Sequence, residues 1–225
     1  MRTLEQTGRI IGVLLLIQLV IGITVNFALL DPIFAAPGFL VNASAHPSKM
    51  ALAALLGIVT GALSVGVAVT AFRAFRQSSQ AMALWFIAMA VAGFAVDVVE
   101  SINLMSLLSL SEAYAKASGA ERDLFPSLRI IVASARNWAH YLGLITGGSS
   151  LFVFYIALLR FALLPRVLAA FGMAAVLLQL TAVTMPLFGH DIVFAMLAPL
   201  GVVQLMAAGW MMVKGWRVES NYART

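Results

Sequence analysis

Six long runs of apolar residues follow one another along the chain, separated by short polar segments. Each run holds roughly 20 residues or more, and at about 1.5 Å per residue a helix of that length spans a bilayer core about 30 Å thick. The pattern therefore predicts an all-α fold, a polytopic membrane helix bundle with six transmembrane helices. The predicted spans are residues 10–30, 50–72, 81–107, 131–159, 162–187 and 192–213.

The third and fourth runs are longer than one crossing needs, so we expect both helices to project beyond the bilayer. The segment between them, residues 109–127, carries five charged residues and is predicted to be the largest part outside the lipid. Pro126 suits the start of the fourth helix. The first run resembles a secretory signal, but its apolar core is longer than the roughly 7 to 15 residues of a signal, so we expect a retained helix.

Composition supports a membrane protein. Of the 225 residues, 62% are hydrophobic and 10% are charged, whereas a soluble domain carries about 25% charged residues. We expect a single integral membrane domain, residues 1–225, whose main partner is the lipid bilayer. The chain has no cysteine, which excludes disulfides, thiolate metal sites and thiol nucleophiles. The net charge is +5, but the basic residues are scattered at the ends of apolar runs, so we predict no nucleic-acid partner.

The distribution of lysine and arginine predicts an orientation. In a six-span chain, nine basic residues fall on one side: Arg2, Arg9, Arg73, Arg76, Arg160, Arg166, Lys214, Arg217 and Arg224. Four fall on the other side: Lys49, Lys116, Arg122 and Arg129. By the positive-inside rule, both ends of the chain are predicted to be cytoplasmic. The same arrangement places tryptophans near the two membrane boundaries, Trp85, Trp210 and Trp216 at the inner one and Trp138 at the outer one.

Glycine pairs with a four-residue spacing occur on two of the predicted spans. They are Gly57 with Gly61 on the second span and Gly143 with Gly147 on the fourth. Small residues at this spacing allow the backbones of neighbouring membrane helices to approach closely. The pairs therefore indicate candidate helix crossings, and not a ligand site.

The charged residues Asp97, Glu100 and Arg136 lie within predicted spans, away from their inner edges. A charge in a membrane helix is costly, so it usually faces the protein interior or a wet cavity and has a partner. Counted from Ala81, Glu100 is about 28 Å along span three. Counted in the opposite direction from Leu159, His140 is also about 28 Å along span four. Glu100 and His140 are therefore predicted to share a level near the outer surface.

The spacing of these residues also places them on common faces. Asp97 and Glu100 are three positions apart, and Arg136 and His140 are four apart, so each pair shares one face of its helix. Asn103 extends the first face and Asn137 the second. Because consecutive helices usually pack side by side, the two polar faces are predicted to meet.

Three interpretations of this cluster remain open. The first is an outward-facing pocket, formed by Asp97, Glu100, Arg136, Asn137 and His140, that binds or transports a small or amphipathic ligand. The second is a structural ion pair that fixes span three against span four. The third is acid and base catalysis by Glu100 and His140. Two carboxylates close together, Asp97 and Glu100, would raise the pKa of one of them, which would place a potential acid beside a potential base. No spacing marks a nucleophile among the nearby serines, Ser101, Ser106 and Ser134.

With no cysteine in the chain, three histidines remain as candidate metal ligands. His46, His140 and His190 all fall on the outer side of the predicted arrangement, which permits a shared metal site without requiring one. Single histidines in three separate segments usually have no common role, so we predict no metal. Paired haem ligands well inside the membrane are missing from the sequence, and the cofactor is left unassigned.

From residue 106 onward the chain carries several short motifs in a fixed order. They are Leu107-Leu108-Ser109-Leu110-Ser111-Glu112 followed by Tyr114, then Arg136-Asn137-Trp138, then Phe154-Tyr155, and Leu163-Leu164-Pro165-Arg166 with Gly172. In these motifs the chain resembles a bacterial membrane family known as domain of unknown function 4386, and Gly8-Arg9-Ile10 is similar but less specific. The resemblance implies a multi-span protein of the bacterial inner membrane and supplies no activity. The family often has an acid where this chain has Asn137, so no carboxylate chemistry is implied at that position.

The sequence thus favours an integral protein of the bacterial cytoplasmic membrane that binds or transports a small or amphipathic ligand between spans three and four. A membrane-embedded lipid-modifying or hydrolytic enzyme that uses Glu100 and His140 is the alternative from a second class. A non-catalytic subunit of a membrane assembly is the third. Homo-oligomerisation or membership of a larger membrane complex is compatible with each of them.

Overall fold

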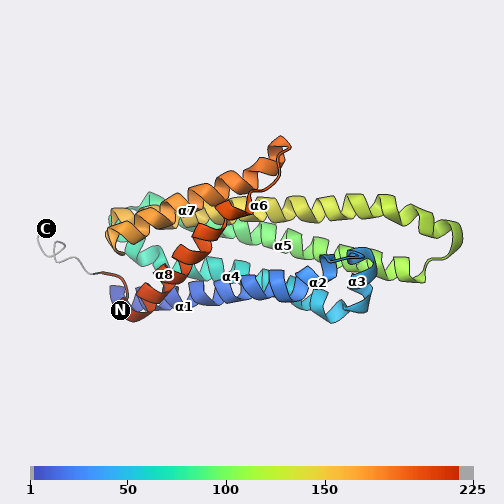
Figure 1. Ribbon diagram of the computed structural model, residues 1–225. Helices are drawn as coiled ribbons and strands as arrows, with labels where there is room; N and C mark the ends of the chain where they lie inside the picture. Colours follow the sequence, from blue (N-terminus) through green and yellow to red (C-terminus); the bar gives the residue numbers. More distant parts are fainter. Residues whose placement is uncertain (1–2, 218–225) are drawn as a thin grey trace, which may run out of the picture. The chain divides into compact units, whose positions relative to one another are not determined.

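The computed structural model describes residues 3–217, and Arg2 and Arg224 of the predicted cytoplasmic set lie outside these residues (Figure 1). All regular structure within 3–217 is helical, which confirms the all-α prediction. Six helical segments are long and apolar enough to cross a membrane, and they overlap the six predicted spans one for one. The side of the membrane that the two ends face stays a prediction.

Each span overlaps its apolar run, and several helices extend beyond the run by a turn or more. The first consists of α1 (Leu4–Ile23), a π-helical stretch η1 (Thr24–Leu30) and the short α2 (Asp31–Phe34). The next three are α4 (Pro47–Ser78), α5 (Gln80–Lys116) and α6 (Phe125–Arg160). The last two are α7 (Arg166–Thr184) with η3 (Met185–Phe188), and η4 (Phe194–Met196) with α8 (Ala198–Lys214). Prolines in the first turns of α2 and α8 fit their starts, because a helix needs no backbone donor there.

α5 and α6 contain 37 and 36 residues, so each is about 55 Å long at about 1.5 Å per residue. Both exceed the roughly 30 Å of a bilayer core, as expected from the length of the apolar runs. In the connecting segment, α5 continues as far as Lys116 and the 3-10 helix η2 (Gly119–Leu124) precedes α6. Most of the predicted polar connection is therefore helical.

The segment between the first and second spans is also folded. α2 is followed by a cis peptide bond between Ala36 and Pro37 and by α3 (Phe39–Ala45). The amide Nδ2 of Asn42 in α3 lies 2.9 to 3.3 Å from the carbonyl oxygens of Pro32, Ile33 and Ala35 and donates to them. The carbonyls of Pro32 and Ile33 lie in the last turn of α2, where the helix offers them no donor, so the Asn42 side chain satisfies groups that lipid could not.

The contacts divide the chain into two compact units, which are described separately. Unit 1 comprises the described parts of Met1–Leu19, Leu63–Gly93 and Leu144–Thr225, and unit 2 comprises Val20–Ala62 and Phe94–Gly143. α1, α4, α5 and α6 each contribute residues to both units.

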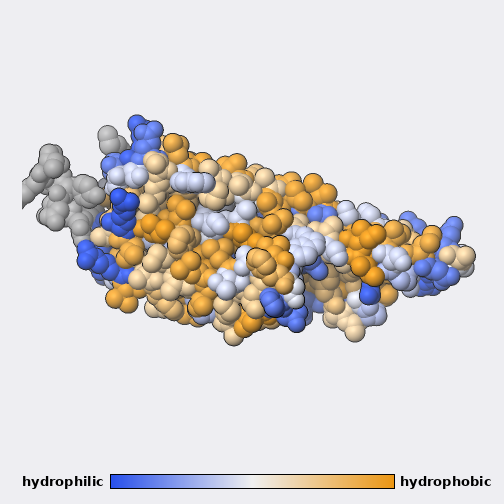
Figure 2. All heavy atoms as spheres, turned by 90° about the horizontal axis from the view of Figure 1, so that it is seen from above, coloured by the Kyte–Doolittle hydropathy of each residue, from blue (hydrophilic) through white to orange (hydrophobic). Residues whose placement is uncertain are grey.

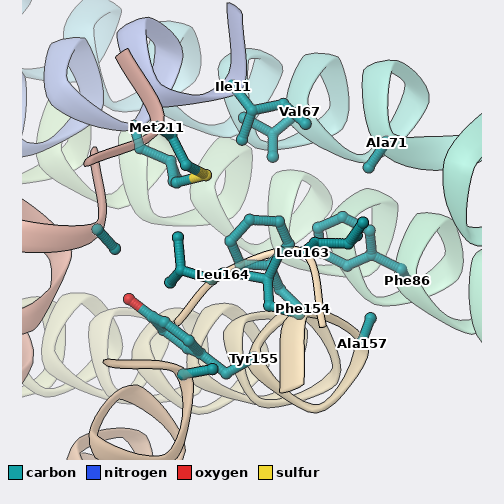
Figure 3. Packing of buried hydrophobic residues seen from close by; sticks show 14 of the residues in the cluster. Ile11, Val67, Ala71, Phe86, Phe154, Tyr155, Ala157, Leu163, Leu164 and Met211 are labelled. Carbon is teal, nitrogen blue, oxygen red and sulfur yellow. The ribbon is translucent and has the colours of Figure 1, made fainter. Parts of the chain in front are cut away.

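Unit 1 has an aromatic core (Figure 3). The rings of Phe75 and Trp216 stack with their centroids 5.7 Å apart, and Phe86 stacks on Phe154 at 5.4 Å. Trp216 is fully buried, and its indole Nε1 donates to the sulfur of Met211 at 3.2 Å. Trp216 is thus a core residue with no exposed face for an interfacial anchor, whereas Trp85 is 59% exposed, as interfacial tryptophans are.

Unit 2 has a smaller core of aliphatic and aromatic side chains from η1, α2, α3, α4 and α5. The buried hydroxyl of Ser111 on α5 joins α3 to this core. Its Oγ accepts a hydrogen bond from the backbone N–H of Ser44 at 2.8 Å and donates to the carbonyl of Leu40 at 2.9 Å. Ser111 therefore links two elements that are about 70 residues apart in sequence through backbone groups.

Apolar side chains also cover much of the visible surface (Figure 2). Large hydrophobic residues such as Phe27, Val69 and Val202 are more than half exposed on the helices. A soluble monomer rarely exposes continuous apolar surface on this scale. The surface therefore suits lipid as the surrounding medium.

Candidate functional site

The predicted polar cluster lies entirely within unit 2, on the two long helices α5 and α6. Asp97 and Glu100 belong to α5, and Arg136 and His140 belong to α6. Their spacing of three and four residues places each pair on one side of its helix. The two pairs meet. The sequence predicted this meeting from the depth of each residue along its helix and from the face on which each pair lies.

Glu100 is the centre of the cluster. Its carboxylate oxygen Oε1 accepts a hydrogen bond from Arg136 Nη2 at 3.0 Å and from His140 Nδ1 at 2.9 Å. An ionised carboxylate can only accept, so Nδ1 of His140 carries a proton in this arrangement. The side chains of Arg136, Glu100 and His140 are 11%, 17% and 26% exposed. The ion pair is thus largely shielded, which is the usual state of charges in membrane helices.

The guanidinium of Arg136 has two further features. Its central carbon lies 5.3 Å from the centroid of the Phe34 ring, a distance at which a cation is attracted to the face of an aromatic ring. Its Nε is buried and has no hydrogen-bond partner among the described residues. Phe34 comes from α2, so the end of the first span also contributes to the cluster. One donor of Arg136 is therefore enclosed but unsatisfied within residues 3–217.

Asp97 lies between two glycines from neighbouring helices. A Cβ added to Gly61 on α4 would stand 2.6 Å from Asp97 Oδ2, and one added to Gly143 on α6 would stand 3.5 Å from Oδ1. The position at Gly143 is also 3.9 Å from Oε2 of Glu100. Both carboxylates therefore lie near Gly143 of α6. The absence of a side chain at Gly61 makes room for Asp97, whereas a Cβ at Gly143 would make ordinary contact with it.

The predicted glycine crossings are confirmed where they border this cluster. A Cβ at Gly57 would stand 3.2 Å from the hydroxyl of Ser101, and one at Gly61 would stand 3.2 Å from the backbone Cα of Phe94. α4 and α5 thus approach closely at this glycine pair. Gly147 differs, since a Cβ there would meet nothing within 4 Å.

The two asparagines predicted to extend the polar faces do not join the ion pair. Asn137 is exposed on α6, and the side chain of Asn103 donates to the carbonyl of Val99 in its own helix at 3.0 Å. One step from Arg136 to Asn137 rotates the side chain by about 100° around the helix, which turns it away from Glu100. The structure thus brings together Asp97, Glu100, Arg136 and His140, and leaves Asn137 outside.

The nearby serine hydroxyls are engaged with the backbone. Ser101 Oγ lies 3.0 Å from the carbonyl of Ala54 and 2.9 Å from that of Asp97, and Ser106 Oγ donates to the carbonyl of Ile102 at 3.1 Å. A serine nucleophile instead donates its proton to a base. Ser134 is exposed on α6. These contacts do not support a serine with a neighbouring base.

The other two histidines belong to segments other than α5 and α6. His46 caps the end of α3, and His190 follows η3. Within residues 3–217, no three histidine, aspartate or glutamate side chains gather into a group that could hold a metal ion.

An apolar groove of about 680 Å³ lies in unit 2, and none of the four charged cluster residues lines it. Its walls come from α4, α5 and α6 and include Ala54, Ile58, Val98, Met105, Ala113 and Val132. Sequence reasoning missed this groove, because the apolar residues that line it look the same in sequence as residues that face lipid. It also missed Phe34, and it predicted Gly61 as a packing residue without its contact with Asp97, because both contacts depend on tertiary packing.

Six spans and a polar cluster shielded within them define a multi-pass integral membrane protein. The chain belongs to the family described as domain of unknown function (DUF4386), which matches residues 10–215 and so confirms the resemblance seen in its motifs. No curated protein and no solved structure matches the chain.

Proposed function

We propose that unit 2 binds a small or amphipathic molecule through the cluster of Asp97, Glu100, Arg136 and His140, as a binding protein or as the binding step of a transporter. The observation that carries this proposal is the enclosed Nε of Arg136, which has no partner among the described residues. A buried donor without an acceptor costs about 1 to 3 kcal/mol, and more when the group is charged. An acceptor oxygen of a ligand would remove this cost.

The charges support binding over a purely structural ion pair. Glu100 engages only Nη2 of Arg136, although a guanidinium offers five donors in a planar fork. A pair that served only to hold two helices together would gain most from a bidentate contact. The single contact leaves part of the fork available to a second anionic or polar acceptor.

The location of the site follows from the orientation predicted by the basic residues. If both ends of the chain are cytoplasmic, the outer end of α5 and α6 faces the other side of the membrane. We place the protein in the bacterial cytoplasmic membrane, with the cluster close to the outer headgroups. A ligand would then enter from the outer leaflet or from the space beyond it. Support for this placement comes from the charge pattern and from the family resemblance.

Native mass spectrometry of the full-length protein, released from a mild detergent, tests the proposal. The wild-type chain should retain a discrete small molecule, identified by extraction. Arg136→Lys should lose it, since lysine keeps the charge but has neither Nε nor the planar fork. Arg129→Lys is the matched control, because Arg129 is an exposed arginine on the same helix. A bare wild-type chain, or an adduct equally retained by Arg136→Lys, would contradict the proposal.

A further inference from the structure

Within residues 3–217, every lysine and arginine of unit 1 is exposed and lies at one end of the membrane helices, the end predicted to be cytoplasmic. These residues are Arg9, Arg73, Arg76, Arg160, Arg166, Lys214 and Arg217. Of the acidic residues in the described part of the chain, Glu5 alone belongs to this end of unit 1. Basic residues at a membrane surface attract anionic lipid headgroups. The surplus of positive charge therefore indicates a surface that faces negatively charged lipid.

Three of these arginines are brought together around Leu163. Arg160 and Arg166 each lie three positions from Leu163, on either side of the turn that joins α6 to α7. The carbonyl of Leu163 accepts a hydrogen bond from the backbone N–H of Arg217 at 3.0 Å. This bond fixes the segment after α8 against the turn. Arg160, Arg166 and Arg217 are called the arginine group below.

The turn that carries the arginine group is an ordered part of unit 1. The backbone N–H of Leu163 donates to the carbonyl of Leu158 at 3.1 Å, and that of Ala162 donates to the carbonyl of Leu159 at 3.3 Å. These two bonds close the end of α6 in a common helix-ending pattern. The side chains of Leu163 and Leu164 are buried in the core. The backbone positions of the arginines are therefore set before any ligand binds, which lowers the cost of ordering them.

The charges of the arginine group are not neutralised within the described residues. No salt bridge joins Arg160, Arg166 or Arg217 to an acidic side chain of residues 3–217. The guanidinium carbon of Arg217 lies 5.7 Å from the centroid of the Trp210 ring, a contact that favours one region for this cation. The group therefore presents three positive charges to an external anion.

An exposed apolar strip leads from the arginine group along α7. Val167 is 84% exposed, Phe171 is 42% exposed and Leu178 is 41% exposed, and their spacing of four and seven residues places them on one face of the helix. An acyl chain can lie along this strip while its headgroup stays beside the arginines. A soluble anion would use the charges and leave the strip without a role.

We propose that the arginine group binds the headgroup phosphate of an anionic phospholipid, with one acyl chain along the exposed face of α7. The planar guanidinium matches the oxygens of a phosphate better than a point charge does. A headgroup with a net negative charge is favoured over a zwitterionic one, because the ammonium of the latter is repelled by the remaining arginines. The site lies in unit 1 and goes beyond the binding proposed for unit 2.

The probe is phosphatidylglycerol, added to the full-length protein after bound lipid has been washed out in non-ionic detergent. Native mass spectrometry over a concentration series gives the affinity, and phosphatidylcholine with the same acyl chains is the comparison. Each basic residue near anionic lipid changes the affinity about fivefold, so phosphatidylglycerol should bind at least about tenfold more tightly. Equal affinities would overturn the proposal. Displacement of phosphatidylglycerol by an equal concentration of inorganic phosphate would overturn the assignment to a lipid.

Substitutions locate the site. Arg160→Gln, Arg166→Gln and Arg217→Gln should each lower the affinity for phosphatidylglycerol about fivefold, and the triple variant should lose the preference over phosphatidylcholine. Arg129→Gln is the matched control, because Arg129 is an exposed arginine near the other end of α6, and it should leave the affinity unchanged. Thermal unfolding checks that each variant remains folded. A triple variant with the affinity of the wild type, or an equal loss in the control, would place the lipid elsewhere and overturn the proposal.

This inference does not depend on the function proposed for unit 2. Arg136→Lys should leave the affinity for phosphatidylglycerol unchanged, because Arg136 belongs to the other unit. If Arg136→Lys weakens phosphatidylglycerol as much as the triple variant does, the lipid does not bind through the arginine group alone, and the assignment is wrong. Phosphatidylglycerol that binds normally to a chain with no ligand on Arg136 would leave the inference standing while the proposed function fails.

Discussion

Gly61 lies directly against the carboxylate of Asp97, so that a Cβ at Gly61 would stand only 2.6 Å from Oδ2. The glycine belongs to α4 and the aspartate to α5, and both lie in unit 2. A position that appears in sequence as half of a helix-packing pair thus also shapes the space around an acidic side chain. Gly61 therefore leaves the space that the carboxylate of Asp97 occupies.

Gly61→Ala should displace the carboxylate of Asp97 or push α4 away from α5. Extra atoms in a packed interior cost about 1 to 3 kcal/mol of stability, which thermal unfolding in detergent would measure. Gly66→Ala on the same helix is the control, since a Cβ there would meet nothing within 4 Å. The control should be neutral or more stable by up to about 1 kcal/mol, because alanine suits a helix interior better than glycine. Equal losses in both variants would contradict this account.

The ion pair between Glu100 and Arg136 should behave as one energetic unit. Arg136→Ala and Glu100→Gln each remove one partner of a largely shielded pair, so each should lower the free energy of unfolding in detergent by on the order of 3 kcal/mol. The double variant should be little worse than the poorer single one, with a coupling of about 0.5 to 3 kcal/mol.

Additive losses in that double-mutant cycle would show that the two side chains act independently. The cycle measures the structural contribution of the pair, and it does not depend on whether a ligand binds. A large coupling together with no retained ligand in the wild type would favour the interpretation of a purely structural pair.

The spans were predictable because lipid imposes a simple condition on sequence. A run of about 20 apolar residues is required wherever a helix crosses the core, and all six runs show it. The pairing of Glu100 with Arg136 and His140 was predictable for a related reason. Charges inside spans need partners, and the helical rise fixes the depth of each residue along two neighbouring helices.

The parts of the site that sequence did not predict depend on irregular structure and on neighbours. Phe34 reaches Arg136 from α2, which follows a π-helical stretch that no apolar run reveals. Trp216 was expected at the membrane boundary, yet its ring stacks on Phe75 in the core of unit 1. Asn137 was expected beside Arg136, but one step along a helix turned it to the exposed side.

Replacing Ser111 should lower the stability of the protein more than replacing Ser109 on the same helix. Ser111→Ala removes the acceptor for the backbone of Ser44 and the donor to Leu40 at a fully buried position, so it should cost about 1 to 3 kcal/mol. Ser109→Ala is the matched control, because Ser109 is exposed and bonds only within α5. Its effect should stay within about 0.5 kcal/mol. Chemical unfolding in detergent gives both values, and a loss as small for Ser111→Ala as for the control would refute the proposed link.

The orientation of the chain can be tested with single cysteines, because the sequence contains no other thiol. Gln77→Cys lies at the exposed end of α4, in the connection predicted to be cytoplasmic, and Ser118→Cys lies in the exposed connection between α5 and η2. A maleimide that does not cross membranes should label Ser118→Cys in intact cells. It should label Gln77→Cys only after the cells are opened.

The reason for this expectation is the excess of basic residues on the side of Gln77, since lysine and arginine in short connections are retained in the cytoplasm. Labelling after cell opening controls for the reactivity of each thiol. The reverse pattern would mean that the chain is inserted the other way. Glu100 lies just past the middle of α5 and near the Ser118 end of the predicted span 81–107. In the reversed orientation the cluster would therefore be nearer the cytoplasmic surface, which would contradict entry of a ligand from the outer leaflet.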